Sequence, residues 1–218
     1  MQNRHFTRLL IGLIVLVILA VGAYFTVQYL QSSKEGSDIK TTNQQVASEN
    51  ILIVYLSRTG NTEAVARMIQ NEVGGTIAEL EPETPYPENY QAQVDQVSDE
   101  NARGYLPPLK TRIENIDQYD TIFLGAPTWG MQLLPPMISF LNEYDLDGKT
   151  VIPFNTNGGY GIGSSFDDIK EGCEGCDVLE GFSVEGGRER DGILYVMEGN
   201  KEIEVRRQVT DWLERIGI

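Results

Sequence analysis

The sequence predicts an α/β fold, a doubly wound parallel sheet of five strands, with a transmembrane helix at its N-terminus. Two observations lead to this fold class. From residue 51 onward, short apolar runs alternate with amphipathic helical patterns, as in a parallel sheet that helices cover on both faces. Ahead of this pattern lies an uncharged apolar segment, residues 9–30.

The apolar segment Leu9–Leu30 is predicted to cross a membrane. As a helix it would be roughly 33 Å long, enough for a bilayer core, and the basic tip, residues 1–8, contains Arg4 and Arg8. A signal peptide cut near Ala23 is the alternative, but the apolar run continues past that point, which favours an uncleaved anchor. The positive-inside rule then gives a single-pass cell-membrane protein whose soluble domain is extracytoplasmic.

Residues 31–50 are rich in Ser, Thr, Asn and Gln and are predicted to be a flexible linker to a domain spanning residues 51–218. The whole chain has 17 Lys+Arg against 32 Asp+Glu, a net charge of −15, and its first 30 residues contain no acidic residue. This acidity argues against nucleic-acid binding. Because His5 is the only histidine and lies at the extreme N-terminus, Ser-His-Asp, Cys-His and His-rich zinc sites are excluded. Any chemistry needs something other than a His general base, and a bound cofactor is one way to supply it.

The first half of the domain is expected to begin with a strand that is buried on both faces, because Ile51–Leu56 is continuously apolar. A helix over residues 62–73 follows, which Gly74 and Gly75 end. Residues 76–80 form the next expected strand. The Pro-rich stretch after it contains a helix near residues 90–102.

The second half repeats this alternation. Apolar runs predict strands at residues 121–125 and 150–154 and the start of a fifth at residues 178–182. Helices are expected between and after them, at residues 136–143, 165–170 and 202–216, the last with a clear amphipathic pattern. Ligands of such sheets bind beyond the carboxyl ends of the strands, so function is expected in the loops there.

The loop after the first strand, Ser57–Thr62, combines three hydroxyl side chains, an Asn amide and one Gly before a helix. Gly allows a tight turn, and the backbone N–H groups of a helix N-terminus attract an anion, so the loop is a candidate phosphate site. A polar loop that only caps the helix is the alternative. The loop fits neither a P-loop nor a GxGxxG motif.

The stretch Ile53–Thr62, continuing to Ala66 and Ile69, resembles the phosphate-loop signature of the flavodoxin family. The similarity extends to about Gly187 and includes the segments PYP at residues 85–87, GAPTWG at 125–130 and PFNTNGG at 153–159. The resemblance implies a flavodoxin-like sheet with strand order 2-1-3-4-5 and FMN as the cofactor. It is closest to a subgroup that has an N-terminal export or anchor segment.

The resemblance also implies which residues bind FMN. Its phosphate would lie on Ser57, Arg58, Thr59, Gly60, Asn61 and Thr62. One face of its ring would lie against the loop of Pro127, Thr128, Trp129 and Gly130. The loop of Asn155, Thr156, Asn157, Gly158, Gly159, Tyr160 and Gly161 would present backbone N–H groups to the pyrimidine end of the ring. Trp129 is the expected stacking residue, with Tyr160 as a second candidate. No catalytic residue and no metal ligand is expected.

The pair Cys173 and Cys176 forms a C-x-x-C motif in a turn before the fifth strand. Two inert thiols, a structural disulfide and a redox-active dithiol are all open, with the first two favoured. A metal site would need two further ligands.

The predicted function is that of a membrane-anchored FMN protein that transfers electrons between redox partners. A carrier needs no general acid or base, and acidic residues would lower the flavin potential and attract partner proteins with a basic docking surface. The alternative is an FMN-dependent NAD(P)H/quinone oxidoreductase, whose pocket would come from residues 81–108 or 185–199, so quinone is also a candidate partner. A domain that has lost flavin is a third hypothesis.

Overall fold

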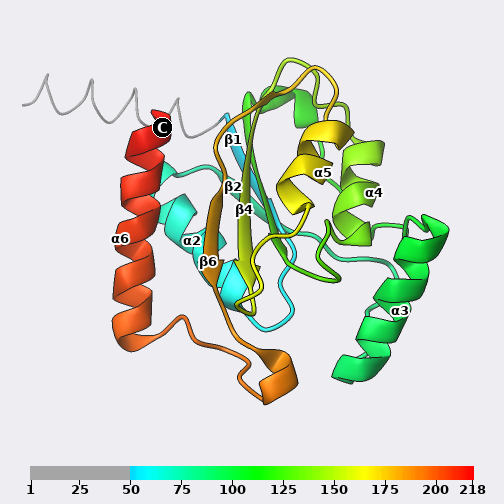
Figure 1. The fold of residues 1–218 in the computed structure, drawn as a ribbon. Coiled ribbons are helices and arrows are strands. Elements are labelled where there is room, and N and C mark those ends of the chain that lie inside the picture. The colour runs from blue at the N-terminus through cyan, green and yellow to red at the C-terminus, as the bar shows by residue number, and fades with distance from the viewer. Residues whose placement is uncertain (1–49) are drawn as a thin grey trace, which may run out of the picture. The chain divides into compact units, whose positions relative to one another are not determined.

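A parallel sheet with the strand order β2-β1-β3-β4-β5 forms the centre of the protein in the computed structural model, which describes residues 50–218 (Figure 1). This order is the one that the sequence predicts. The strands are β1 (Ile51–Tyr55), β2 (Thr76–Glu79), β3 (Thr121–Pro127), β4 (Thr150–Asn157), β5 (Asp177–Val178) and β6 (Phe182–Glu185).

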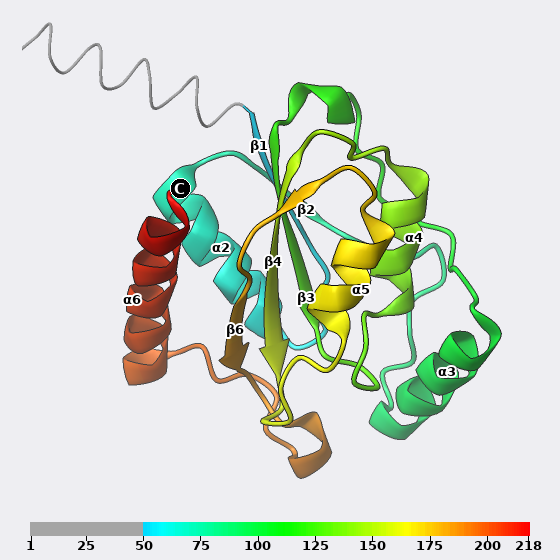
Figure 2. The same ribbon diagram turned by 45° about the horizontal axis from the view of Figure 1, so that its top comes forward.

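Helices cover both faces of the sheet, as a doubly wound fold requires. They are α2 (Asn61–Val73), α3 (Tyr90–Arg103), α4 (Pro135–Glu143), α5 (Ser165–Gly172) and α6 (Gly199–Ile216), with short 3-10 helices η1 (Ile116–Gln118) and η2 (Glu189–Asp191). Helices α2 and α6 lie on one face, and α4 and α5 on the other (Figures 1 and 2).

The strand β1 is buried on both faces, as its continuous apolar run predicts. Leu52 and Val54 point into the core under α4 and α5, whereas Ile53 and Tyr55 point into the core under α2 and α6. Full burial of such a side chain stabilises the fold by about 1.5–3 kcal/mol. Burial on both faces leaves no position on this strand for a polar residue, which confirms the prediction.

The predicted fifth strand is in fact two short strands, so the sheet has six strands and the five-strand prediction was wrong in this detail. Both β5 and β6 pair with β4, at its two ends. The chain leaves the sheet between them because the carbonyl of Glu180 accepts a hydrogen bond from Trp212 Nε1 at 2.9 Å. A Cβ on Gly181 would also overlap the ring of Phe166, so only Gly fits at this break.

Helix α3 lies at the lower edge of the molecule, at the same end as the carboxyl ends of β4 and β6 (Figure 2). The side chain of Asn89 caps its N-terminus by accepting a hydrogen bond from the Ala92 N–H at 3.0 Å. Only Gln93, Val97 and Glu100 of this helix are buried. Such a small buried face leaves room for a cavity between α3 and its neighbours.

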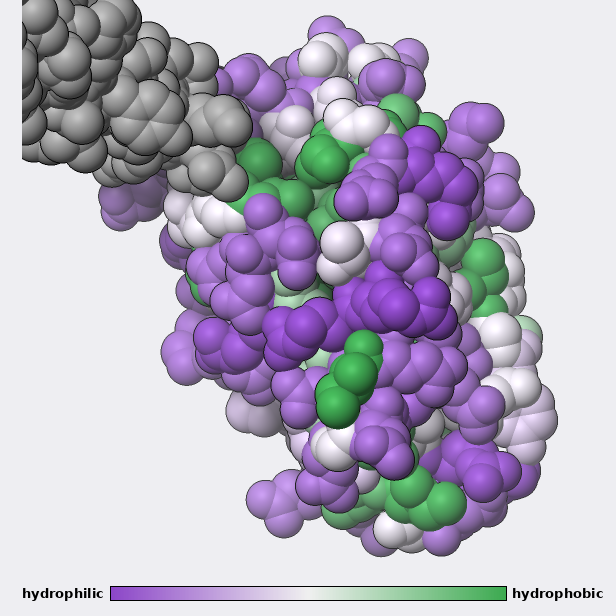
Figure 3. All heavy atoms as spheres, turned by 90° about the vertical axis from the view of Figure 1, so that its left-hand side faces the viewer, coloured by the Kyte–Doolittle hydropathy of each residue, from purple (hydrophilic) through white to green (hydrophobic). Residues whose placement is uncertain are grey.

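The outer surface of α6 is mostly hydrophilic (Figure 3). It carries i,i+4 ion pairs between Glu202 and Arg206 and between Arg207 and Asp211. Within residues 50–218, no helix combines the length and apolarity needed to cross a membrane. The predicted anchor, residues 9–30, and the linker up to residue 49 lie outside the described residues.

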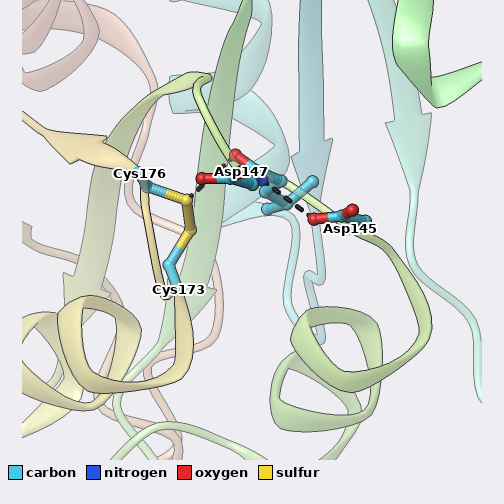
Figure 4. Close-up of a disulfide and its surroundings, with 5 residues drawn as sticks. Asp145, Asp147, Cys173 and Cys176 are labelled. Carbon is cyan, nitrogen blue, oxygen red and sulfur yellow. Dashed lines mark hydrogen bonds between the residues drawn. A yellow bond between two sulfur atoms is a disulfide. The ribbon is translucent and has the colours of Figure 1, made fainter.

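Cys173 and Cys176 form a disulfide, one of the alternatives that the sequence left open (Figure 4). The bridge links the C-terminal end of α5 to the turn before β5, beside the Asp145–Asp147 turn that precedes β4. A Cβ on Gly175 would overlap the Asp147 carboxylate, which explains the Gly inside the motif.

Candidate functional site

The carboxyl ends of β1, β3 and β4 meet at one end of the sheet, where their loops surround a cavity of about 170 Å³. The segment after β6, which includes η2, closes this end of the molecule (Figure 2). The lining residues are Arg58, Thr59, Asn61, Thr62, Tyr90, Pro127, Thr128, Trp129, Thr156, Asn157, Gly158, Tyr160, Gly186, Gly187, Arg188, Glu189, Arg190 and Asp191.

The loop after β1 leads directly into the N-terminus of α2. Gly60 caps the helix with a left-handed φ of 82°, which favours Gly at this position. The Ser57 hydroxyl oxygen is buried and has no hydrogen-bond partner in the described chain. Because buried polar atoms are normally bonded, this oxygen is a candidate partner for a ligand atom at the loop that leads into α2; the Ser165 hydroxyl oxygen is the other buried oxygen without a partner in residues 50–218.

The side chain of Asn61 fastens the distant 194–196 segment to this loop. Its Nδ2 donates to the Leu194 carbonyl at 2.6 Å and to Thr59 Oγ1 at 2.8 Å. Its Oδ1 accepts the Val196 N–H at 3.1 Å. Asn61 is almost fully buried, so its amide positions protein segments and also borders the cavity.

The hydroxyls of Thr62 and Thr156 lie 2.8 Å apart and form a buried hydrogen bond between the first and third loops. The backbone N–H of Thr128 donates to the Thr156 carbonyl at 3.0 Å, which adds the second loop. Thr128 Oγ1 also donates to the Gly161 carbonyl at 2.9 Å. All three predicted loops are therefore held together before any ligand is considered.

Arg58 lines the cavity and bonds to two segments beside it. Its Nε lies 2.8 Å from a carboxylate oxygen of Glu189, and its terminal nitrogens donate to the carbonyls of Pro87 and Glu88 at 2.8 and 2.6 Å. Both side chains of the ion pair are mostly buried. The guanidinium thus joins η2 to the Pro-rich stretch and is compensated by Glu189.

Trp129 lies in a tight turn after β3 and borders the cavity, as predicted. The turn is closed by a backbone bridge between Trp129 and Gln132, and both Gly130 and Met131 have a positive φ. The ring of Tyr86 packs edge-on against Trp129 with centroids 5.1 Å apart. This contact fixes the orientation of the indole beside the cavity.

Tyr86 is itself fixed by a hydrogen bond that its hydroxyl donates to Glu100 Oε2 at 2.6 Å. Burial, followed by this bond and the charge of Glu100, raises the pKa of Tyr86 far above its usual range. Tyr86 therefore remains a protonated donor at physiological pH, and its contact with Trp129 is independent of pH there.

The third loop is held by hydrogen bonds of its own asparagine side chains. Asn157 Oδ1 accepts the N–H groups of Gly159 and Gly161 at 2.9 and 3.2 Å, so the protein already satisfies these two donors. Asn155 is buried and donates to the Ala126 carbonyl at 2.9 Å, which joins β4 to β3. Tyr160 is 65% exposed, and its hydroxyl accepts a hydrogen bond from Arg190.

The structure brings most of the predicted site residues together around the cavity. Those that do not line it are Ser57, Gly60, Gly130, Asn155, Gly159 and Gly161. The FMN residues that the resemblance implies do not include Tyr90 and the stretch Gly186–Asp191, which do line it. Both lie in the stretches 81–108 and 185–199, which the sequence gives only as a pocket for the alternative oxidoreductase. Within residues 50–218, no group of His, Cys, Asp and Glu side chains could hold a metal ion.

The class that this fold and cavity define is a doubly wound α/β protein, whose cavity lies at the carboxyl ends of the strands, between the N-terminus of α2 and an aromatic residue after β3. A family model described as Flavodoxin matches residues 50–199. The chain therefore belongs to the flavodoxin family.

Individual relatives agree with this assignment. The chain is 27% identical over 125 residues to a flavodoxin of Nostoc sp. and 28% identical over 120 residues to one of Synechocystis sp.. The matches cover 56% and 53% of this chain and 59% and 56% of those flavodoxins, so the chain spans little more than half of their length.

Solved structures show the same fold. A protein of Bacteroides eggerthii assigned as a flavoprotein is 29% identical, with a TM-score of 0.62 and coverage of 78% of this chain and 98% of that one. A Lactobacillus acidophilus flavoprotein in complex with FMN is 22% identical, with a TM-score of 0.56 and coverage of 66% and 98%. At that identity, the second likeness concerns the fold alone.

Proposed function

We propose that this protein binds FMN and carries electrons between redox partners while anchored to a membrane by residues 9–30. The observation that carries the FMN proposal is the buried, unpartnered Ser57 hydroxyl at the N-terminus of α2. A phosphate there would accept its hydrogen bond and face the positive end of the helix. The residues present therefore fit the phosphate of the cofactor.

The chain would hold FMN through three sets of groups. Ser57, Thr59 and the first N–H groups of α2 would bind the phosphate, and Trp129 would stack against the ring. Tyr160 is the exposed candidate for a second stacking contact. Bound FMN supplies one-electron and two-electron redox chemistry, which the side chains of this protein lack.

A carrier is favoured over an enzyme because the chain has no histidine outside its N-terminal tip, and a carrier needs no general acid or base. The negative charge of the chain would attract partner proteins with a basic docking surface. Redox partners of this kind are the proposed donors and acceptors.

The soluble domain is proposed to lie outside the cytoplasm. The basic tip before residues 9–30 supports this orientation through the positive-inside rule. The Cys173–Cys176 disulfide supports it independently, because disulfides persist in oxidising compartments. Protease added to intact cells should remove a C-terminal tag and leave an N-terminal tag; protection of the C-terminal tag would refute the orientation.

Titration of the full-length protein in detergent with FMN tests the cofactor proposal. We expect quenching of flavin fluorescence with a dissociation constant below about 1 µM, equivalent to about 8 kcal/mol. A redox titration of the complex should then show two separated one-electron steps and slow oxidation of NAD(P)H. Absence of FMN binding would refute the proposal, and rapid NAD(P)H turnover would replace the carrier by an enzyme.

A further inference from the structure

A second and larger cavity, of about 540 Å³, lies between α3 and the turn after β3. It shares Tyr90, Thr128, Trp129 and Glu189 with the first cavity, so the two are neighbours on either side of these residues. Its volume is within the range of about 300–1,000 Å³ that is usual for small-molecule sites. Its other lining residues are Gln93, Val94, Val97, Ser98, Asn101, Ala102, Gly130 and Gln132.

The Gln93 side chain of this second cavity has no hydrogen-bond partner among the described residues. Only 3% of the Gln93 surface is exposed, and its carboxamide makes no hydrogen bond to any described residue. Its helix neighbours Gln91 and Gln96 are both bonded, to Asp95 and Glu100. The Gln93 amide is not among the fully buried side-chain atoms that lack a partner, so it is accessible from the cavity and available to a ligand as donor and acceptor.

Charge at the second cavity limits the class of ligand. Glu189 is its only acidic lining residue, and that carboxylate is already paired with Arg58. No Lys, Arg or His of residues 50–218 lines it. A phosphate or pyrophosphate ligand such as NAD(P)H would therefore find no compensating cation. An uncharged ligand can be buried in the cavity without a compensating cation.

The remaining walls favour a flat ligand. Trp129 and Tyr90 are aromatic, and Val94 and Val97 add apolar surface from α3. Such walls pack well against a planar ring, while neutral amides can bind carbonyl oxygens at its edge. A quinone combines these properties: it is planar, uncharged and carries carbonyl oxygens.

We propose that this second cavity binds a quinone beside Trp129, as an electron acceptor for the proposed FMN site. This inference rests on the proposed function. The bound quinone would take up two electrons and two protons, which reduced FMN gives up, and would leave as the hydroquinone while FMN returns to its oxidised form. Gln93 is assigned to the quinone carbonyl and is a binding residue.

Binding of menadione, an uncharged naphthoquinone, tests this assignment without relying on turnover. Calorimetry on the full-length protein, with and without saturating FMN, should show a menadione site in both forms. Gln93→Leu should weaken menadione at least about tenfold and leave the FMN dissociation constant unchanged. The matched control is Gln91→Leu, at an exposed glutamine of the same helix, which should change neither constant.

Ser98→Phe provides a second variant, because Ser98 is an exposed residue of α3 that lines the cavity and tolerates substitution without disturbing the core. Its ring should fill the cavity and abolish menadione binding while FMN still binds.

Two results would overturn the inference. Competition between menadione and FMN would show that the cavity belongs to the flavin ring. Absence of menadione binding, or equal weakening by Gln91→Leu and Gln93→Leu, would remove the quinone site. In either case, intact FMN binding and the redox titration would leave the proposed carrier function standing, so the two failures are distinguishable.

Discussion

The two neighbouring cavities differ in how the protein treats its own polar groups. Around the first cavity, Asn61, Thr62 and Arg58 are bonded to other parts of the chain. Around the second, the Gln93 side chain has no such bond and lines the cavity. Paired groups give a rigid frame, whereas an amide without a protein partner is free to bind a ligand. The difference separates the framework of the site from the positions that await a ligand.

The largest effect is expected for Asn61→Ala. The change leaves the Val196 N–H and the Leu194 carbonyl without their partner and should lower the free energy of unfolding by about 2–4 kcal/mol. Urea denaturation of the full-length protein in detergent measures it. Asn142→Ala removes one bond of an exposed asparagine and should stay within about 0.5 kcal/mol. Equal effects would mean that Asn61 does not hold the 194–196 segment.

Thr62→Val breaks the buried bond to Thr156 and should cost about 1–2 kcal/mol of stability and weaken FMN binding. The double variant with Thr156→Val removes both partners, so its loss should be smaller than the sum of the two single losses. Denaturation of all three variants measures the coupling. Strictly additive losses would show that the two hydroxyls act independently.

Ser57→Ala should weaken FMN binding while leaving the stability of the protein nearly unchanged. Its hydroxyl has no partner in the protein, so the free energy of unfolding without FMN should change by less than about 0.5 kcal/mol. FMN should nevertheless bind about tenfold more weakly, equivalent to about 1.4 kcal/mol. Fluorescence titration alongside denaturation separates the two quantities. A loss of stability with unchanged FMN affinity would place this hydroxyl in the framework.

The smallest effect is expected for Glu189→Gln. Loss of the carboxylate frees Arg58 to attract the phosphate and removes a negative charge from the cavity, so FMN should bind several-fold more tightly at low salt. Stability should fall by only about 1 kcal/mol although the pair is mostly buried, because the amide oxygen of a Gln side chain can still accept a hydrogen bond from Arg58. Glu143→Gln, which breaks an exposed pair with Arg112, is the control. Weaker FMN binding in Glu189→Gln would mean that the ion pair itself shapes the site.

Much of the fold was predictable because its signals are local. The run Ile51–Leu56 is apolar throughout, and the structure buries its strand on both faces. Helix α2 ends before Gly74, as its sequence indicates. The fifth strand was harder, because the bond from Trp212 to Glu180 that interrupts it joins residues 32 positions apart. Local patterns carry no information about such a partner.

The positions of two parts of the candidate site were also predictable from local signals. The loop Ser57–Thr62 and Trp129 follow strand ends that the sequence reveals, so their placement could be expected. The roles of the individual side chains in the third loop could not be predicted in this way. Asn155 turns toward β3 and Asn157 bonds two N–H groups of its own loop, because side-chain direction depends on the packing of neighbouring strands.

By itself, the sequence determined the alternation of strands and helices, the position of the Ser57–Thr62 loop before α2 and, through the motif in that loop, the family. Periodicity, Gly positions and a contiguous motif are short-range properties, and they are readable in one dimension. Only the tertiary structure decided that Glu189 meets Arg58 across 131 residues and that α3 leaves a cavity beside Trp129. Those features arise where segments distant in the sequence approach each other. They depend on the free energy of packing, which no local pattern encodes.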